Sequence, residues 1–411
     1  MRVRKLGGDR AGELRVGRFL RNARVTPSEM TATAVARTHA RVRGRQVVAV
    51  QDTTSLRDDG DQRSLHLHPT IAIDLAEGSL IGLLDAQILH RSGGKRARTG
   101  RRAFADKESR RWLDATIRAS DLLEAGAASV TMIADREADI YEEFALRPAR
   151  MELVIRVQQD RSLSDGRLLS GCLAGVSELG RETIDLPAGP GRPARQAMLA
   201  LRACPVRLKR PQQSTAAETA ALPAEVALWL VEACELDPPA GAPPANWRLL
   251  TTYPAASLAA AKEITRLYRL RWNIEQVFRV MKTKGFDIES STVAEGGPFE
   301  NLAMAVLIAA IQVMQMVRER DGAARRPALD VFDQAEQPAI EAISASLEGK
   351  TAKQKNSHPP GSLAHATWVC ARLGGWTGYY GKPGPITIHS GFVRLRHMLH
   401  GWVLGKDVRI S

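Results

Sequence analysis

The first half of the chain contains two short apolar runs that each end in an acidic residue. Residues 47–51 lead to Asp52, and residues 130–134 lead to Asp135. Short apolar runs rich in β-branched residues are typical of buried strands. A single Asp at a strand end is usually a turn former or a helix cap. Two such acids, each opening a polar segment, also fit the edge of an α/β sheet, where functional groups gather.

The remaining hydrophobic pattern of the first half predicts further elements around these two strands. Residues 1–45 are typical of one or two basic helices, with a helix start at residues 26–29. Residues 106–125 have apolar positions at helical spacing, and another helix is expected to open near Asp139. Additional strands are predicted at residues 66–75, 80–90 and 153–157.

The second half of the chain changes character twice. Between residues 161 and 245, Pro- and Gly-rich stretches separate β-branched or alternating runs, which predicts a β-rich insertion. From Leu258 onward the pattern is mostly helical. The predicted fold class is therefore α/β, a mixed-sheet core with an inserted β module and a helical C-terminal part. The expected domains are an N-terminal region (1–45), a core in two pieces (46–160 and 246–295), the insertion (161–245) and the C-terminal part (296–411).

Residues 268–282 are predicted to form one helix with a polar stripe. At about 100° per residue, an α-helix brings four side chains onto a stripe roughly 60° wide: Tyr268, Arg271, Glu275 and Lys282. A stripe of this kind is most often the solvated face of an amphipathic helix. One acid between two bases and a tyrosine also suits a phosphodiester, with the bases for phosphate and the acid for a metal. The helical geometry leaves both interpretations open.

The charge balance favours a polyanionic partner. The 411 residues include 58 Lys and Arg against 45 Asp and Glu, which leaves a net charge of +13. A surplus of this size raises the local concentration of polyanions, and nucleic acid is the commonest of them. A basic enzyme without such a partner has the same composition, so the charge supports DNA binding without establishing it.

The cysteines and the longest apolar stretch favour a cytoplasmic protein without a membrane partner. The four cysteines form no CxxC pair, which predicts reduced, buried thiols and neither a zinc site nor a disulfide framework: Cys172, Cys204, Cys234 and Cys370. The stretch from Leu302 to Val317 contains two glutamines and is shorter than the roughly 20 residues of a membrane span. It is therefore predicted to be a core helix.

The acids Asp52, Asp135 and Glu275 together form a donor set for hard divalent cations. Mg²⁺ prefers carboxylate ligands and keeps waters and substrate phosphate in its shell. Two such ions activate an attacking oxygen and stabilise the leaving oxygen in phosphodiester chemistry. We therefore expect two Mg²⁺ ions as cofactor, with Mn²⁺ as a substitute.

The same residues carry a resemblance to a known family. The spacing Tyr268, Arg271, Glu275, Lys282 resembles the Tyr-Arg-Glu-Lys signature of the insertion-sequence-four class of DDE transposases. Blocks similar to those of this class follow in the same order over roughly residues 45–410, at residues 51–56, 107–112, 135–140 and 371–375. Taken together, the signature and the block at residues 135–140 are far more specific than a single short motif.

The resemblance implies a fold, a reaction and partners. The implied fold is a ribonuclease-H-like core with a β module inserted between the second Asp and the Glu. The implied reaction is Mg²⁺-dependent cut-and-paste transposition, in which an end is nicked, a hairpin forms and is resolved, and the strand is transferred. The implied partners are double-stranded DNA, as transposon ends and as target, and a second copy of the chain that makes a homodimer on DNA.

The resemblance also assigns roles to individual residues. Asp52, Asp135 and Glu275 are implied as the catalytic metal ligands. The residues implied to contact DNA phosphates are Tyr268, Arg271, Lys282, Arg156 and Arg279. Trp247 resembles a tryptophan that stacks on a base flipped from the hairpin, while a core residue of the insertion is the alternative interpretation.

The chain departs from this class ahead of Asp52, where its members normally carry a longer region that recognises transposon ends. Residues 1–45 are interpreted as a remnant of that region. The alternative function is a truncated regulator that pairs with a full-length transposase and does not transpose.

Overall fold

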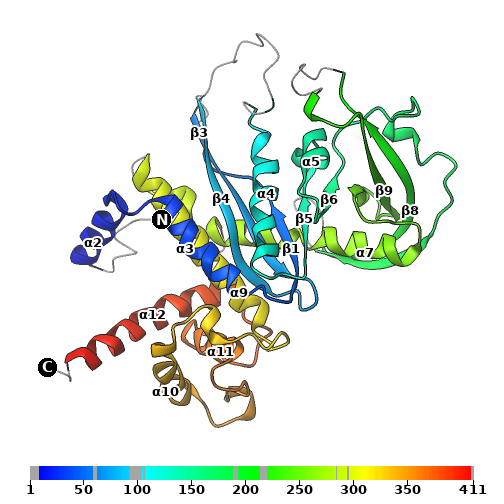
Figure 1. The fold of residues 1–411 in the computed structure, drawn as a ribbon. Helices are drawn as coiled ribbons and strands as arrows, with labels where there is room; N and C mark the ends of the chain where they lie inside the picture. Colours follow the sequence, from blue (N-terminus) through cyan, green and yellow to red (C-terminus); the bar gives the residue numbers. More distant parts are fainter. Residues whose placement is uncertain are drawn as a thin grey trace. The chain divides into compact units, whose positions relative to one another are not determined.

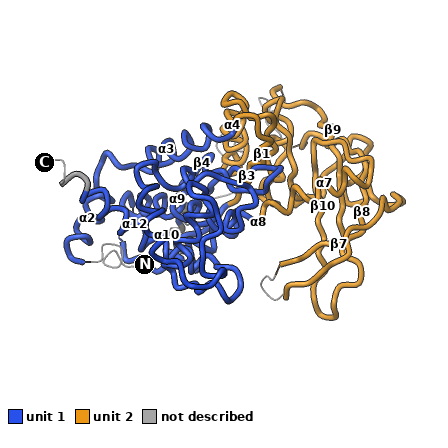
Figure 2. The backbone as a smooth tube through the Cα atoms, turned by 90° about the horizontal axis from the view of Figure 1, so that it is seen from below, with its two compact units in different colours: residues 1–42, 53–92, 273–411 blue, residues 43–52, 93–272 orange. Residues whose placement is uncertain are grey.

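The computed structural model describes residues 9–58, 63–92, 104, 107–187, 193–212, 220–283, 285–293 and 296–408. The chain divides into two compact units, coloured in Figure 2. Unit 1 comprises Met1–Val42, Thr53–Ser92 and Asn273–Ser411, and unit 2 comprises Arg43–Asp52 and Gly93–Trp272. The basic segment at residues 95–102 lies outside the described residues.

Unit 2 contains a mixed sheet with the strand order β1-β5-β6-β10-β9-β8-β7 (Figure 1). Its strands are β1 (Gln46–Gln51), β5 (Ser129–Ala134), β6 (Met151–Arg156), β7 (Gly180–Leu186), β8 (Arg195–Lys209), β9 (Glu225–Leu236) and β10 (Asn246–Thr251). β1, β5 and β6 run parallel, and the other neighbours are antiparallel. The strands predicted at 130–135 and 153–157 are present, and β7, β8 and β9 of the predicted insertion extend the sheet beyond β10.

Helices cover this sheet where its strands are most apolar. Positions 47–50 of β1 are fully buried, as expected for a parallel strand with a layer on each face. α4 (Arg110–Glu124) packs on β1 and β5, and α7 (Leu258–Arg269) packs on β5, β6 and the inserted strands. The helix expected near Asp139 begins slightly later, as α5 (Tyr141–Leu146) after a short 3₁₀ turn.

The prediction of one continuous helix over residues 268–282 is wrong. α7 ends at Arg269, and α8 (Trp272–Met281) starts a new helix. At the junction, the N–H groups of Leu270 and Arg271 bond to carbonyls three residues back, which tightens the turn and redirects the chain. The junction contains neither Gly nor Pro, the residues that most often mark the end of a helix in a sequence. The helical spacing of apolar residues therefore gives no indication of the break.

Unit 1 combines an antiparallel β-sheet segment with helices from both ends of the chain. β2 (Thr54–Asp58) pairs with β3 (Arg63–Asp74), which pairs with β4 (Leu80–Ser92). β3 and β4 confirm the strands predicted at 66–75 and 80–90, whereas β2 was not predicted. The helices of this unit are α2 (Arg10–Arg21), α3 (Pro27–His39), most of α8, α9 (Gly297–Glu319), α10 (Gln337–Leu347), α11 (Leu363–Leu373) and α12 (Pro385–Val408).

The N-terminal and C-terminal helices of unit 1 meet the sequence expectations. α2 and α3 lie in residues 1–45, where one or two basic helices are predicted, and α2 is the basic one; Thr26 caps α3 by accepting a hydrogen bond from the Glu29 N–H. α9 contains the predicted core helix and is long and apolar enough to cross a membrane, but 72% of its most apolar stretch is buried inside the protein. Its buried Gln315 donates to the carbonyl of Ile81 at 2.8 Å, as a core position requires.

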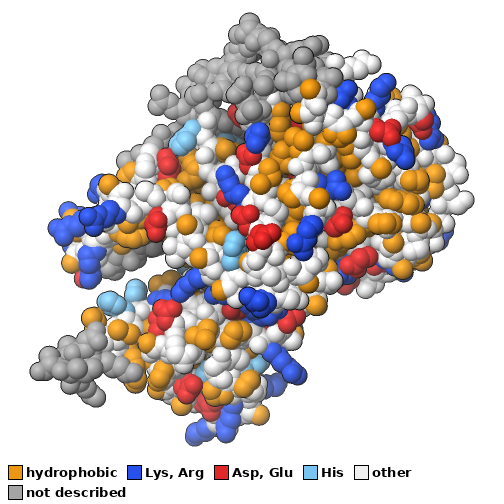
Figure 3. Space-filling model, viewed as in Figure 1, with side chains coloured by type: hydrophobic (Ala, Val, Ile, Leu, Met, Phe, Trp, Pro, Cys, Tyr) orange, Lys and Arg blue, Asp and Glu red, His pale blue; other side chains and the backbone are white. Residues whose placement is uncertain are grey.

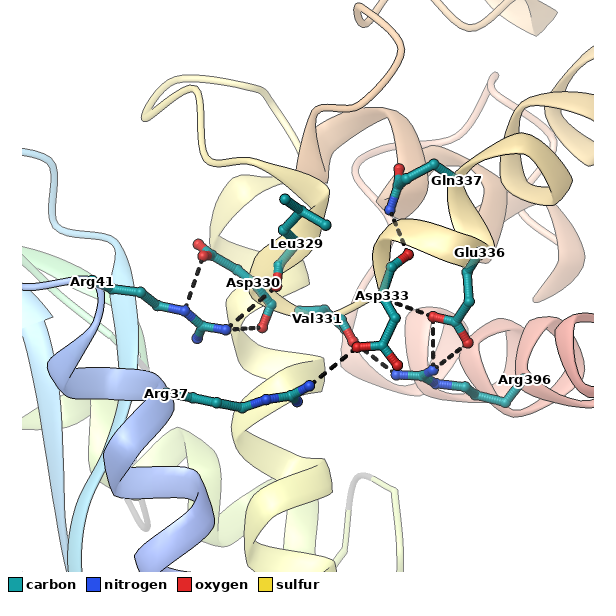
Figure 4. A network of polar contacts seen from close by, with 9 residues as sticks. All are labelled: Arg37, Arg41, Leu329, Asp330, Val331, Asp333, Glu336, Gln337 and Arg396. Atoms are coloured by element: carbon teal, nitrogen blue, oxygen red, sulfur yellow. Dashed lines mark hydrogen bonds and ion pairs between the residues drawn. The ribbon is translucent and has the colours of Figure 1, made fainter.

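A polar network joins the α3 region to α12 within unit 1 (Figure 4). Arg41, which follows the end of α3, pairs with Asp330 at 3.2 Å, and Arg37 of α3 pairs with Asp333 at 3.1 Å. From the other side, Arg396 of α12 contacts both carboxylate oxygens of Glu336, at 2.9 and 3.1 Å. The segment from Asp330 to Glu336 therefore connects an N-terminal helix with the C-terminal one.

Candidate active site

Three predicted site residues form a row at the carboxyl edge of the unit 2 sheet. Val50 of β1 pairs with Ile133 of β5, so Asp52 and Asp135, two positions further on, occupy matching places beyond neighbouring parallel strands. Ala134 pairs with Ile155 in the same way, which aligns Asp135 with Arg156 at the end of β6. Paired positions of adjacent strands point to the same face, about 4.8 Å apart. The sequence therefore places two acids and one base side by side.

The α7–α8 junction supplies a partner for each acid. Arg271 donates from Nη1 to Asp52 Oδ2 at 3.0 Å, and its side chain is only 8% exposed against 20% for Asp52. The Tyr268 hydroxyl donates to Asp135 Oδ1 at 3.1 Å. The Arg156 guanidinium lies 3.7 Å from the same oxygen. The redirected chain at the junction thus brings Tyr268 and Arg271 onto the row of acids.

Tyr268 stays protonated in this environment. Its side chain is buried, and burial raises the pKa of Tyr268 to about 12, against the opposing effect of the nearby Arg271 charge. The neutral hydroxyl is therefore a stable hydrogen-bond donor to Asp135 throughout the physiological pH range.

Trp247 lies behind Tyr268 in a cluster of aromatic rings. Its ring centroid is 5.8 Å from that of Tyr268 and 6.2 Å from that of Trp272, and its side chain is 6% exposed. In this arrangement Trp247 supports the tyrosine that contacts Asp135, which agrees with the core-residue interpretation. Stacking on a flipped base stays a prediction.

The other predicted residues lie on or directly after α8, in the part of the chain that belongs to unit 1. Glu275 is half-buried in the first turn of α8, and Arg279 is exposed in its last turn. Lys282 follows the end of the helix and pairs with Glu289 at 2.8 Å. The structure thus brings together those predicted site residues that belong to unit 2. The roles of Glu275, Arg279 and Lys282 stay predictions.

Asp139 fixes the loops that carry Asp135 and Arg156, a role that sequence reasoning did not identify. Its Oδ2 accepts the backbone N–H groups of Gln158 and Gln159 at 2.8 and 2.9 Å. Its Oδ1 accepts from Arg161 Nε at 2.8 Å, and the Asp139 side chain is fully buried. The only sequence signal was its place in the acidic segment after β5. Asp139 therefore ties the segment after β5 to the segment after β6.

A buried acid lies on the opposite side of β1 from Asp52. Glu143 of α5 is fully buried and accepts a hydrogen bond from the Thr116 hydroxyl at 2.5 Å. Thr116 in turn accepts from Gln51 Nε2 at 3.3 Å, and Gln51 directly precedes Asp52. Burial raises the pKa of Glu143 to about 7, and its second oxygen has no hydrogen-bond partner among the residues that the structure describes. Nothing in the sequence distinguishes this Glu from the adjacent Glu142, which is only partly buried.

The carboxylates at the sheet edge have the chemistry of a divalent-cation site. The Tyr268 hydroxyl and the nearest nitrogen of Arg156 both approach Oδ1 of Asp135. Asp52 adds a second oxygen donor group at the matching position of the neighbouring strand. Within the described ranges, no three His, Cys, Asp or Glu side chains are grouped as a metal site. The pair fits a hard cation that takes part of its shell from water and substrate.

A comparison with protein families matches most of the chain to one family. Residues 28–311 match the family described as "Transposase DDE domain". The matched region contains both acids, the α7–α8 junction and all of α8.

Proposed function

Because the chain belongs to the transposase DDE-domain family, we propose that it is a Mg²⁺-dependent DNA-cutting and DNA-joining enzyme of the cut-and-paste type. The proposed reaction comprises end nicking, hairpin formation and resolution, and strand transfer into target DNA. The single observation that carries the proposal is the alignment of Asp52 and Asp135 at the ends of neighbouring parallel strands. Arg271 donates a hydrogen bond to Asp52, and Tyr268 donates one to Asp135. Parallel strands carrying acids at their carboxyl ends also support the proposal of a ribonuclease-H-like core.

The proposed metal ligands are Asp52, Asp135 and Glu275. When bound, Mg²⁺ supplies Lewis-acid activation of the attacking oxygen and charge neutralisation at the leaving oxygen. Glu275, in the first turn of α8, joins this set as a proposal that rests on its place in the Tyr-Arg-Glu-Lys spacing.

Basic side chains of the protein orient the two acids and the DNA. Arg271 holds the Asp52 carboxylate from the junction side, and a guanidinium is also the kind of donor that suits phosphate oxygens. Arg156 provides a second positive charge beside Asp135. Tyr268 fixes the rotamer of Asp135 through its hydroxyl. The proposed DNA contacts of Arg279 and Lys282 extend the same role along α8.

α2 provides a second proposed DNA contact, in the N-terminal region of the chain. Its arginines lie on the surface, and Figure 3 shows them as a blue group at this helix. Of the group, Arg10 pairs with Glu13 at 2.9 Å. A cluster of exposed arginines on one short helix is the electrostatic footprint expected of a DNA-binding surface.

Nicking and joining of DNA that carries the ends of the element tests the proposal. We expect wild-type protein to cut in Mg²⁺ or Mn²⁺ and not in a chelator. Asp135→Ala is expected to reduce cutting by at least about a thousandfold, since a metal ligand is removed, while DNA binding stays. The readout is the amount of nicked and joined product.

Asp165→Ala is the matched control, because Asp165 is an exposed aspartate of unit 2 whose partner is the surface residue Arg167. It should cut like the wild type. If wild type and Asp135→Ala behave alike, the catalytic assignment fails, and a DNA-binding regulator that does not transpose becomes the better interpretation.

A further inference from the structure

Two cysteines that are distant in sequence lie in contact within unit 2. The Sγ atoms of Cys172 and Cys204 are 3.6 Å apart, and Cys204 Sγ is also 3.7 Å from the backbone carbonyl oxygen of Cys172. A disulfide needs the sulfur atoms at about 2.05 Å, so closure requires an approach of roughly 1.5 Å. The expectation of four buried thiols is wrong for Cys204 and Cys234, which are partly exposed, and the sequence carries no spacing that reveals the Cys172–Cys204 contact.

The two cysteines come from elements that differ in rigidity. Cys204 lies in the middle of β8, which is hydrogen-bonded to β7 on one side and β9 on the other. Cys172 caps a short 3₁₀ turn (Leu169–Gly171) at the end of a surface loop. The loop side can therefore supply the movement that brings the sulfur atoms together.

The surroundings make Cys172 the more reactive thiol. The S–H of Cys204 donates to Cys172, and the guanidinium groups of Arg248 and Arg167 add positive charge, so the pKa of Cys172 is lowered. The pKa of Cys204 is raised by the same hydrogen bond and by burial. Cys172 is 4% exposed and Cys204 is partly exposed, so the pair is not sealed from solvent. This arrangement places a more acidic thiol, Cys172, beside a second thiol that can resolve its oxidised form.

We propose that Cys172 and Cys204 are a redox modification site that forms a reversible disulfide with a small peroxide as oxidant. The Cys172 thiolate attacks one peroxide oxygen, the O–O bond breaks, and hydroxide leaves, which gives a sulfenic acid on Cys172. The Cys204 thiol then attacks that sulfur, the S–O bond breaks, and the oxygen leaves as water. In total, two thiols and one hydrogen peroxide give one disulfide and two waters.

The bond would fasten the loop to β8. At present, the 3₁₀ turn is held by the guanidinium of Arg248, which donates to the carbonyl oxygen of Leu169 at 2.9 Å, and by the N–H of Leu169, which donates to the carbonyl oxygen of Arg161. Arg161 also binds Asp139, which ties together the segments carrying Asp135 and Arg156. Oxidation would therefore stiffen a loop that leads to the sheet edge, without touching the acids themselves.

Peptide mapping of the full chain after treatment with hydrogen peroxide tests the proposal without DNA. We expect wild-type protein to give one linked peptide pair containing Cys172 and Cys204, which disappears on reduction with dithiothreitol. The oxidised protein is expected to melt at a higher temperature than the reduced protein, because a cross-link restricts the unfolded chain. The linked pair and the shift should both be absent in Cys204→Ser and in Cys172→Ser.

Cys234→Ser is the matched control, since Cys234 lies on the neighbouring strand β9 and is also partly exposed. It should behave like the wild type. The proposal would be overturned if both Cys172 and Cys204 stay unlinked after peroxide treatment of the wild type, or if the linked peptide pair contains Cys234. A Cys172–Cys204 link that leaves the melting temperature unchanged would overturn the fastening of the loop.

Discussion

Individual side chains at the sheet edge are held by partners that compensate their charge. Asp52 is mostly buried beside Arg271, and a buried carboxylate is tolerated only with such a partner. Asp135 shares one oxygen between a neutral hydroxyl and a more distant guanidinium. The two acids therefore differ: Asp52 is in a direct ion pair at 3.0 Å, whereas Asp135 accepts a hydrogen bond from a neutral hydroxyl and has its nearest guanidinium nitrogen at 3.7 Å.

Glu143 should make the stability of the protein depend on pH. Its pKa is about 7 in the folded state and near 4.5 in the unfolded state, because burial disfavours the charged form. The folded state thus holds a proton that the unfolded state releases within this window. The free energy of unfolding should fall as pH rises from about 4.5 to about 7, by on the order of 3 kcal/mol.

Urea denaturation of wild type and Glu143→Gln across this pH range measures the effect. The variant cannot titrate at this position, so its stability should be flatter with pH, and it should gain on the wild type as the solution becomes alkaline. Two parallel stability profiles would show that Glu143 does not titrate in this window.

At the scale of elements, the strands were more predictable than the α7–α8 junction. The runs at 47–52 and 130–135 indicate buried strands, and their acids appear where those runs end. That the two acids align is decided by strand register, which depends on pairing between distant segments. The break after Arg269 and the contact between Cys172 and Cys204 are likewise tertiary features, which local periodicity does not record.

The ion pairs at the two ends of the network in Figure 4 are expected to differ in strength. One end is formed by Arg396 of α12. Arg396 contacts both oxygens of Glu336, donates to the carbonyl of Val331 at 2.7 Å and lies 5.1 Å from the rings of Phe332 and Phe392. We expect Arg396→Ala to lower the free energy of unfolding by about 2 kcal/mol, since the substitution removes a charge-assisted pair and the packing of the guanidinium on both rings.

Arg37→Ala is the comparison, because Arg37 and Asp333 are 52% and 68% exposed. A solvated pair of this kind contributes about 0–1 kcal/mol. Chemical denaturation of both variants measures the difference. Equal losses would mean that Arg396 contributes no more than a surface pair does.

At the scale of the whole molecule, the net charge of +13 becomes informative only once its distribution is known. Many exposed arginines of unit 2 are compensated by a nearby acid. Arg167, Arg181 and Arg207 pair with acids at 2.7, 2.9 and 2.6 Å. Arg15, Arg18 and Arg21 of α2 have no acidic partner among the described residues. These three arginines therefore form a group of uncompensated charge on one helix.

A triple variant tests whether α2 contacts DNA. Replacing Arg15, Arg18 and Arg21 with Gln should weaken DNA binding and reduce the slope of log affinity against log salt by about 0.9 for each phosphate that the protein no longer neutralises. Fluorescence titration of labelled duplex DNA at several salt concentrations gives both quantities. The same substitutions at Arg167, Arg181 and Arg207 are the control and should leave the slope almost unchanged. An equal change in both triple variants would assign the binding to overall charge.

The alignment of Asp52 with Asp135 limits how this protein can change in length. A residue inserted into or deleted from β1 would shift Asp52 by one position and turn its side chain to the opposite face, toward α4. A change of the same kind in β5 would displace Asp135 alone. Among related proteins that keep the activity, insertions and deletions should therefore accumulate between these strands and in the loops of the insertion. The two strands themselves should keep a constant length even where their side chains drift.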